Sequence, residues 1–364
     1  MGIAFDKQEL NVLGHYESIR PGKDGVPKLD SPVTVKENTM LALNGKRPFW
    51  YPMVGMAGGD YKPFRPRMFP DLFVAHDAMD GEAPMEWDRI GKVQEGWFDT
   101  KWRYVDQVGG AMIEPGTEKI HSIQDWEKLT WPDLSQLDWE GNAQANQRYL
   151  SSELPIEFCI PTTYWERVMS ILDVSNAAVM MIEDDDREAC NAFFTKLTDL
   201  YVDMMHRVKK FYDPDIILMH DDWGHQRGPF FSRDTFDERL LPHFKRIVRT
   251  IHDLGMRFEL HCCGMAEAFV PEMIEIGIDL WIPQNMNHVP ELVSKYRNQG
   301  LLFGVYVPVV APGMPDEEEL SQKIAKEFYE TYGDGPVAYI NYGFSDVLYK
   351  YMYEYGRKAY SMKI

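Results

Sequence analysis

The sequence predicts an α/β protein folded as a (β/α)8 barrel, with an N-terminal extension over residues 1–45 and an irregular insertion over residues 60–135. Short apolar runs alternate with amphipathic helical patterns, which is typical of buried parallel strands joined by helices. These runs number about eight, the number of strands that closes a barrel. No glycine-rich phosphate loop follows the first run, so an open doubly wound sheet is the second choice.

The first predicted elements lie on either side of the extension and inside the insertion. Turn-rich PGKDGVPKLDSP precedes the helical pattern VKENTMLALNG, and the first strand is predicted at PFWYPMVG, residues 48–55. The insertion is rich in Pro, Trp and Gly. It contains a predicted hairpin at WFDTKWRYVDQVGGAMIEP and leaves room for one further strand.

The second half of the chain is more regular. A long amphipathic helix is predicted at DTFDERLLPHFKRIVRTIHDLG. The remaining six strands are predicted at IEFCIP (156–161), IILMHDD (216–222), RFELHCCG (257–264), IDLWIPQN (278–285), LLFGVYVP (301–308) and VAYINYG (337–343). We interpret residues 1–364 as one barrel domain.

Composition limits the classes of partner. Of the 364 residues 45% are hydrophobic and 26% are charged, as in a soluble globular protein, and no apolar run is long enough for a membrane span. The N-terminus lacks the pattern of a secretion signal, so we expect a cytoplasmic protein. A formal net charge of -19 repels nucleic acid, and four cysteines, two of them adjacent, indicate reduced thiols.

Polar side chains crowd the carboxyl ends of the predicted strands, where barrels carry their functional groups. Tyrosines and tryptophans among them could form a wall against a flat ligand. The candidates for catalysis are Asp221, Asp222, His225 and Tyr342, and those for substrate binding are Tyr164, Trp165, Trp223, Gln284, Asn285 and Asn341.

The segment LHCCGMAE, residues 260–267, carries the strongest chemical signal. Alternate residues of a strand share a face, so His261 and Cys263 point together while Cys262 points away. An imidazole and a thiolate suit Zn²⁺, and the third ligand would come from Asp222, Asp221 or His225. Two alternatives stay open at this point. Cys263 could be a nucleophile activated by the imidazole, or the segment could be an ordinary strand end with buried cysteines.

Several blocks, in order, resemble one family. They are LALNGKRPFWYPM, DWEKLTWPDL, DDWGHQRGPFFSRDTFDERLLPHFKRIVRTIHDLGMRFELHCCG and IEIGIDLWIPQN. From about residue 35 the chain resembles the uroporphyrinogen decarboxylase superfamily, including its corrinoid-dependent methyltransferase branch. The resemblance implies a (β/α)8 barrel, in agreement with the alternation of strands and helices.

The resemblance also separates the branches by their chemistry. Decarboxylases of the family carry arginines that pair with substrate carboxylates, whereas PMVGMAGGDY has Gly55 and Gly59 at about those positions. The methyltransferase branch implies zinc on a His-x-Cys-Gly segment, which His261 and Cys263 match, and on a later cysteine, which this chain lacks. We therefore expect a different third zinc ligand, with Asp222 the first choice.

The resemblance implies an O-demethylase-type methyltransferase that moves methyl from a small donor, chiefly an aromatic methyl ether, to a corrinoid on a separate carrier protein. Zinc or a protonated aspartate would activate the ether oxygen. A homodimer is one further possibility. The alternatives are a decarboxylase or lyase of the same fold and a non-catalytic binder of tetrapyrroles or corrinoids.

Overall fold

The structure is a computed structural model that describes residues 4–18, 24–55, 59–69, 71, 80–81, 92–105, 107, 110–343 and 345–361. The chain divides into two compact units. Unit 1 comprises Met1–Pro63, Ser151–Glu157 and Asp279–Ile364, and unit 2 comprises Phe64–Leu150 and Phe158–Ile278. The interpretation of residues 1–364 as a single domain stays a prediction. Of the predicted insertion, residues 70, 72–79, 82–91, 106 and 108–109 lie outside the described residues, and the last three fall within the predicted hairpin.

Unit 1 begins with a hairpin and a helix. Strands β1 (Val12–Glu17) and β2 (Asp24–Leu29) pair antiparallel, and helix α1 (Val35–Leu43) follows. Thr34 starts α1 as a capping box with Glu37, because each side chain binds a backbone N–H of the other residue. The predicted N-terminal extension is thus a β-hairpin followed by the helix expected at VKENTMLALNG.

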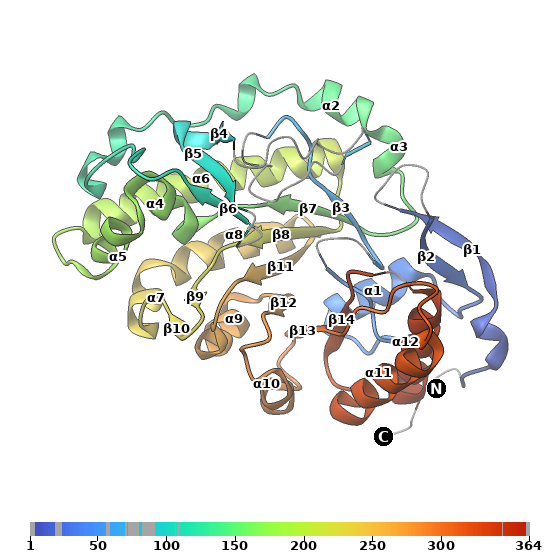
Figure 1. Ribbon diagram of the computed structural model, residues 1–364. Helices are drawn as coiled ribbons and strands as arrows, with labels where there is room; N and C mark the ends of the chain where they lie inside the picture. The colour runs from blue at the N-terminus through green and yellow to red at the C-terminus, as the bar shows by residue number, and fades with distance from the viewer. Residues whose placement is uncertain are drawn as a thin grey trace. The chain divides into compact units, whose positions relative to one another are not determined.

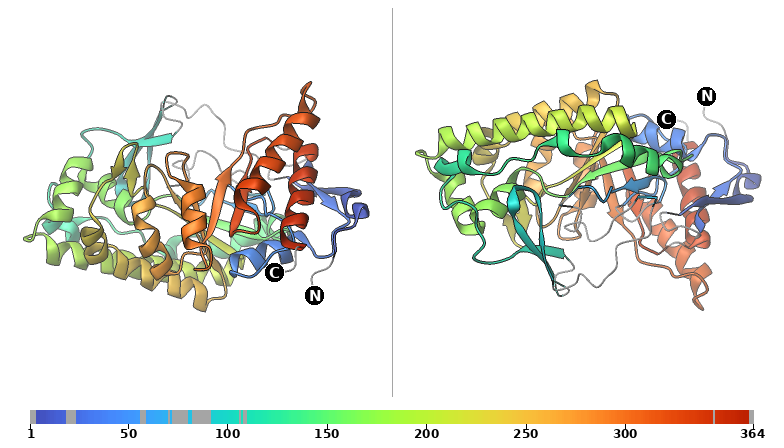
Figure 2. Two further views of the ribbon diagram at one scale, coloured as in Figure 1. Left: turned by 90° about the horizontal axis from the view of Figure 1, so that it is seen from below. Right: turned by 90° about the horizontal axis from the view of Figure 1, so that it is seen from above.

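Unit 1 also contains the last three strand–helix pairs. Neighbouring strands β12, β13 and β14 are parallel, and Figure 2 shows helices α11 and α12 side by side. These elements are β12 (Leu280–Pro283), α10 (Val289–Tyr296), β13 (Leu302–Tyr306), α11 (Glu317–Tyr332), β14 (Val337–Ile340) and α12 (Asp346–Ser361).

The strand predicted at 48–55 is reduced to a single parallel bridge between Met53 and Tyr339 in β14. Two backbone hydrogen bonds flank this bridge, from Val54 N and from Tyr339 N. Pro48 and Pro52 have no N–H to donate, and Gly55 takes a φ of 139°. A regular strand therefore cannot extend in either direction.

Unit 2 carries a three-stranded antiparallel sheet from the insertion, of strands β4 (Val93–Glu95), β5 (Lys101–Val105) and β6 (Gly110–Ile113). The pairing of β5 with β6 confirms the predicted hairpin. Between β4 and β5, Phe98 and Asp99 both have positive φ, an uncommon conformation for side chains of this kind. Two short helices, α2 (Trp139–Ala145) and α3 (Gln147–Leu150), follow the insertion.

The parallel strands that matter for the site are β7 (Ile156–Ile160), β8 (Ile216–His220) and β11 (Arg257–Cys262). In unit 2, β8 and β11 lie side by side and in register from Ile216 opposite Arg257 to His220 opposite His261 (Figure 1). Helix α8 packs against β11 and against α6. The helices of this part are α4 (Tyr164–Leu172), α5 (Val174–Ile182), α6 (Arg187–Tyr212), α7 (Arg233–Arg239), α8 (Leu241–Asp253) and α9 (Val270–Ile276).

The long helix predicted from Asp234 to Gly255 is in fact two helices, α7 and α8, which meet at Leu240. Pro242 lies in the first turn of α8, where its missing N–H has no hydrogen bond to lose. Both helices bury aromatic rings: Phe236 of α7 and Phe244 of α8 pack on the indole of Trp223, with ring centroids 4.7 and 5.1 Å away.

The order of the strands along the chain confirms the predicted α/β class with TIM-barrel-like alternation. Strand β3 (Lys62–Phe64) is the further strand expected in the insertion. With the bridge at Met53, the described strand positions in chain order are Met53, β3, β7, β8, β11, β12, β13 and β14. Among the described residues, no helix is long and apolar enough to cross a membrane.

Candidate metal centre

Four potential metal ligands converge at the carboxyl ends of β8 and β11 in unit 2. The register sets His220, the last residue of β8, opposite His261 of β11. Asp222 and Cys263 follow within two residues. One ligand atom from each of these four side chains lies within 4.8 Å of all the others. The sequence prediction named His261, Cys263 and Asp222, and the structure brings all three together with His220.

Short contacts hold the group in place. Asp222 accepts a hydrogen bond of 2.6 Å from the backbone N–H of Cys263, which ties the two strand ends together. The Cys263 sulfur lies 3.4 Å from Nε2 of His261. The imidazoles of His220 and His261 stack with their centroids 4.6 Å apart. The backbone register and these three contacts together bring the four donors to one place.

Two glycines let the loops beyond the strands approach closely. Gly264 has a φ of 79°, and a Cβ there would lie 2.2 Å from the carbonyl carbon of Gly224. A Cβ on Gly224 would in turn lie 2.6 Å from the carbonyl oxygen of Met265. Only glycine fits at either position. The glycine of the HCCG segment thus has a steric role beside the candidate ligands.

The two imidazoles have opposite electrostatic surroundings. Burial, assisted by the charges of His220 and Arg65, holds the pKa of His261 well below its usual value. Burial alone would also lower the pKa of His220, but the negative charges of Glu166 and Asp222 raise it well above the usual value. Glu166 is the nearest of these, with its carboxylate 3.0 Å from Nδ1 of His220. His261 is therefore neutral at pH 7, with a lone pair available to a metal.

The group fits zinc by its chemistry and by its spacing. The two nitrogens, one sulfur and one oxygen are ligands that zinc accepts. Bonds of about 2.0–2.3 Å in a tetrahedron place ligand atoms roughly 3.5 Å apart, so the spread of 4.8 Å requires small side-chain adjustments only. Nδ1 of His261 is buried and has no hydrogen-bond partner among the described residues.

For Cys263 as a nucleophile, the structure provides the expected contact with His261 but not a reactive thiol. The 3.4 Å approach of Cys263 to His261 is within reach of a sulfur hydrogen bond. Burial, however, raises the pKa of the Cys263 thiol, with a lowering contribution from His220 that does not reverse it. A thiol with a raised pKa is a weak nucleophile at neutral pH. Cys262 points away from the group, as strand alternation predicts, and its sulfur accepts from the backbone N–H of Trp223.

The two adjacent aspartates have different positions. Asp222 lies in the four-donor group, whereas Asp221 is fully buried elsewhere. The Asp221 carboxylate accepts hydrogen bonds from the backbone N–H groups of Trp165 and Glu166 and from the Trp223 indole. Burial raises its pKa to about 6 despite these bonds. Its contacts are those of a structural residue, and its predicted catalytic role stays a prediction.

The three aromatic candidates of unit 2 lie in the core. Tyr164, Trp165 and Trp223 have no exposed surface. The Tyr164 hydroxyl is bound to Thr198, and Trp165 packs on Phe230 and Phe231. A ligand would reach these rings only if the loops around them moved. Their predicted role in substrate binding is therefore untested by the fold, and core packing explains where they are.

Residues 160–340 match the family described as uroporphyrinogen decarboxylase (URO-D). This URO-D-like segment contains all four donors and ends with β14. No curated protein matches the chain.

Solved structures add a likeness of fold. A methyltransferase from Methanosarcina mazei has a TM-score of 0.56 and 14% identity, over 90% of this chain and 98% of its own. A B12-independent methionine synthase from Shewanella sp. W3-18-1 has a TM-score of 0.36 and 12% identity, over 63% of this chain and 67% of its own. At these identities the first match shows a shared fold, and the second carries no argument.

Within the URO-D-like segment, two residues near the group were missing from the sequence prediction. His220 is the last residue of the strand IILMH, whereas the candidates were chosen among the residues that follow each strand. The parallel register of β8 and β11 is the signal that could have found it, because equivalent strand ends meet. Glu166 lies in the first turn of α4, and no pattern in the sequence links it to the end of β8.

The remaining predicted residues occupy other surroundings. His225 is half-buried, and its Nδ1 accepts a hydrogen bond from the backbone N–H of Arg227. In unit 1, Gln284 is half-buried and Asn285 is exposed, while Tyr342 is exposed, with its hydroxyl near that of Tyr306. Asn341 is buried and donates to the carbonyl of Pro308. The roles assigned to these residues stay predictions.

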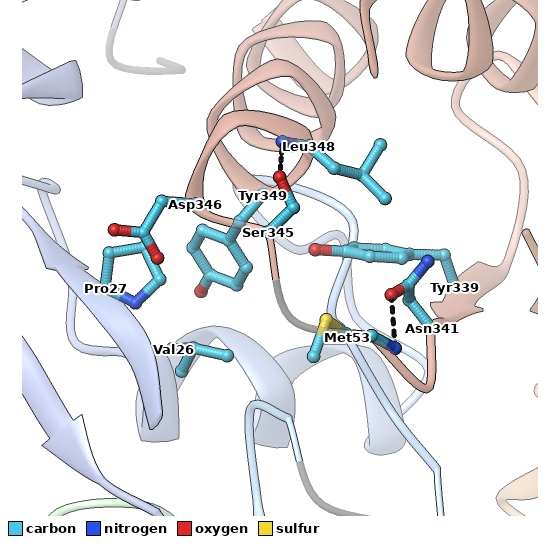
Figure 3. A pocket seen from close by; sticks show the side chains of 10 residues that line it. Val26, Pro27, Met53, Tyr339, Asn341, Ser345, Asp346, Leu348 and Tyr349 are labelled. Carbon is cyan, nitrogen blue, oxygen red and sulfur yellow. Dashed lines mark hydrogen bonds between the residues drawn. The ribbon is translucent and has the colours of Figure 1, made fainter. Parts of the chain in front are cut away.

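Asn341 also lines a small pocket inside unit 1, next to Tyr339 and the start of α12 (Figure 3). The Tyr339 hydroxyl is buried there and has no hydrogen-bond partner among the described residues. Nearby, Tyr349 donates to the buried carboxylate of Asp60. The pocket holds no set of converging metal ligands, so it differs in kind from the group at β8 and β11. Its lining residues are Val26, Pro27, Met53, Tyr339, Asn341, Gly343, Ser345, Asp346, Leu348 and Tyr349.

Proposed function

We propose that this protein is a methyltransferase that moves a methyl group from a small donor, chiefly an aromatic methyl ether, to the cobalt of a corrinoid on a separate carrier protein. The observation that carries the proposal is the group of two histidines, a cysteine and an aspartate at adjacent strand ends. The URO-D-like match over residues 160–340 and the fold shared with a methyltransferase support it.

Zinc is the metal that these residues would hold. His220, His261, Cys263 and Asp222 offer four ligand atoms, and an open position for a donor oxygen would arise if one of them moved aside. Asp222 is the first candidate to move, because its carboxylate is partly exposed and already bound to a backbone N–H. When bound, zinc would supply Lewis acidity at the ether oxygen.

The reaction needs that acidity because an aryl ether releases its phenolate reluctantly. The bond between the methyl carbon and the ether oxygen breaks, and its electron pair stays on the oxygen. The new bond to the methyl carbon takes both its electrons from the reduced cobalt of the carrier. The phenolate then takes up a proton to leave as a phenol. The chain contributes by holding the donor oxygen at the group and keeping the methyl carbon accessible to the carrier.

The described contacts offer an aromatic neighbour for such a donor. Phe230 is 37% exposed, and its ring lies 5.3 Å from that of His225. His225 is tied to the loop after Cys263, because its carbonyl accepts from the N–H of Met265. We therefore assign Phe230 and His225 as the first residues to test for contact with the donor ring.

The experiment that tests the proposal combines zinc-loaded protein, a reduced corrinoid carrier protein and a panel of methoxyarenes. The expected result is an absorbance change from reduced to methylated corrinoid with one or more donors, matched by release of the corresponding phenol. Cys263→Ala is the matched negative variant, and Cys262→Ala is the control of similar size. Activity that is absent across the panel, with zinc present, would contradict the proposal.

A second candidate is a decarboxylase or lyase, favoured by the description of the family that matches residues 160–340. It predicts release of carbon dioxide from a tetrapyrrole or aromatic acid without any carrier protein. Gly55 and Gly59, at about the positions where the resemblance places substrate-binding arginines, count against it. Carbon dioxide release in the absence of a carrier would favour this candidate over methyl transfer.

A further inference from the structure

Helix α4 is held to the end of β8 by two side chains. The Thr163 hydroxyl, at the start of the helix, donates to the carbonyl of His220 at 3.0 Å and so does not cap the helix itself. Asp221 takes over that task. Its carboxylate accepts from the N–H groups of Trp165 and Glu166 at 3.2 and 3.0 Å. The first turn of α4 is thereby fixed relative to His220 from both directions.

This attachment brings Glu166 to one edge of His220. Its carboxylate oxygens lie 3.0 and 3.1 Å from Nδ1 of the imidazole. The Glu166 side chain is 11% exposed and that of His220 is 20% exposed, so water competes little for the contact. On the opposite edge of the ring, Nε2 lies 3.9 Å from Asp222, toward the other donors.

We propose that Glu166 is a positioning residue for the metal centre: its carboxylate accepts a hydrogen bond from the Nδ1–H of His220, so that the lone pair of Nε2 faces the ion. The inference rests on the proposed zinc-dependent function. A carboxylate behind a ligand histidine fixes the tautomer and the ring orientation, and it makes the imidazole a better ligand. Asp221 and Thr163 act one step further back, because they hold the helix that carries Glu166.

The second histidine lacks such support. Nδ1 of His261 is buried without a partner among the described residues, and its Nε2 meets only the Cys263 sulfur. The two imidazoles are therefore unequal: a carboxylate orients His220, whereas His261 has only the Cys263 sulfur and the His220 ring beside it. We expect loss of Glu166 to weaken the centre through His220 and to leave Cys263 and His261 where they are.

The test measures zinc affinity by competition with a chromogenic chelator in full-length wild type, Glu166→Ala, Glu166→Gln and Glu188→Gln. Glu188 is an exposed carboxylate in the first turn of α6 and is the matched control for the loss of charge. We expect affinity to fall roughly 10- to 100-fold in Glu166→Ala. The fall should be smaller in Glu166→Gln, whose amide oxygen can still accept a hydrogen bond from Nδ1–H, and absent in Glu188→Gln.

A second readout separates positioning from a general loss of structure. In zinc-loaded protein with ¹⁵N-labelled histidine, wild type and Glu188→Gln should show a slowly exchanging Nδ1–H signal from His220, assigned with His220→Gln. That signal should be absent from Glu166→Ala. Unchanged affinity together with an unchanged signal in Glu166→Ala would overturn the inference and leave the zinc centre standing. Failure of the wild type to bind zinc would overturn both.

Discussion

Two carboxyl groups are buried, Asp60 in unit 1 and Glu166 in unit 2, and they differ in the groups that they contact. Burial raises the pKa of Asp60 to about 7, and it raises the pKa of Glu166 as well, although the neighbouring His220 acts in the opposite direction there. The Asp60 oxygens accept from the N–H of Met53 and the hydroxyl of Tyr349, and among the described residues Asp60 belongs to no group of converging metal ligands. Glu166 instead contacts His220, a member of the four-donor group. A raised carboxyl pKa therefore shows only that the group is buried, whereas converging ligand atoms indicate a metal site.

The largest expected effect is at the ligands themselves. His261→Ala or Cys263→Ala should lower zinc affinity by roughly a thousandfold or more, because a structural or catalytic zinc needs its full protein ligand set. Elemental analysis after dialysis should give about one zinc per wild-type chain and near none in either variant. Cys262→Ala is the control, because the Cys262 sulfur lies outside the group. Equal zinc loss in Cys262→Ala would remove the distinction between the two cysteines.

The second largest effect is expected at Asp60, the buried carboxyl group of unit 1, and concerns how the free energy of unfolding depends on pH. The folded-state pKa of Asp60, about 7, lies above its unfolded value of 3.8. The protonated form therefore stabilises the fold at low pH, and this contribution is lost as pH rises from about 4 through 7. Relative to Asp60→Asn, wild type should lose up to about 4 kcal/mol of unfolding free energy over that range. Chemical denaturation at several pH values measures it, and a constant difference between the two proteins would refute it.

A smaller effect is expected at the residue that holds α4. Asp221→Asn replaces a carboxylate that accepts three N–H groups by an amide that can satisfy fewer of them. We expect a loss of about 2–3 kcal/mol in unfolding free energy of the zinc-free protein. Asp222→Asn is the comparison, with little change in stability without zinc and weaker zinc binding. The reverse pattern, with stability lost only in Asp222→Asn, would mean that the two aspartates have been assigned the wrong roles.

The smallest effect is predicted at the rim of the pocket in unit 1. His15 and Asp346 form a contact of 2.8 Å, but both side chains are substantially exposed to solvent. His15→Gln should change the unfolding free energy by about 1 kcal/mol or less, since exposed pairs contribute little. Thermal unfolding at low and high salt measures this change. A large loss of unfolding free energy at low salt that disappears at high salt would contradict this prediction, because it would show that the His15–Asp346 pair contributes strongly to stability.

The sequence predicted the alternation of strands and helices well because each strand is a short, buried apolar run. It failed where local chemistry interrupted a pattern. Prolines reduced the strand at 48–55 to one bridge, and Pro242 began a second helix inside one apolar stripe. The apolar period continues across both features, so periodicity alone could not show the breaks.

The candidate site was predicted in part for a related reason. Strand alternation within one segment was enough to pair His261 with Cys263 and to set Cys262 apart. Which of Asp221 and Asp222 joins them depends on the course of a loop after its strand, which has no fixed period. His220 required the register between two strands, and Glu166 required the packing of α4 against β8. Such contacts join segments that are far apart in the chain, so no local sequence pattern predicts them.

The central claim is that His220, His261, Cys263 and Asp222 together hold one zinc ion. X-ray absorption spectroscopy at the zinc edge, on protein loaded with one equivalent, tests it most directly. The account predicts a first shell with one sulfur at about 2.3 Å and nitrogen or oxygen ligands at about 2.0–2.1 Å, with the sulfur lost in Cys263→Ala. A shell without sulfur in the wild type, or a spectrum unchanged by Cys263→Ala, would contradict the claim.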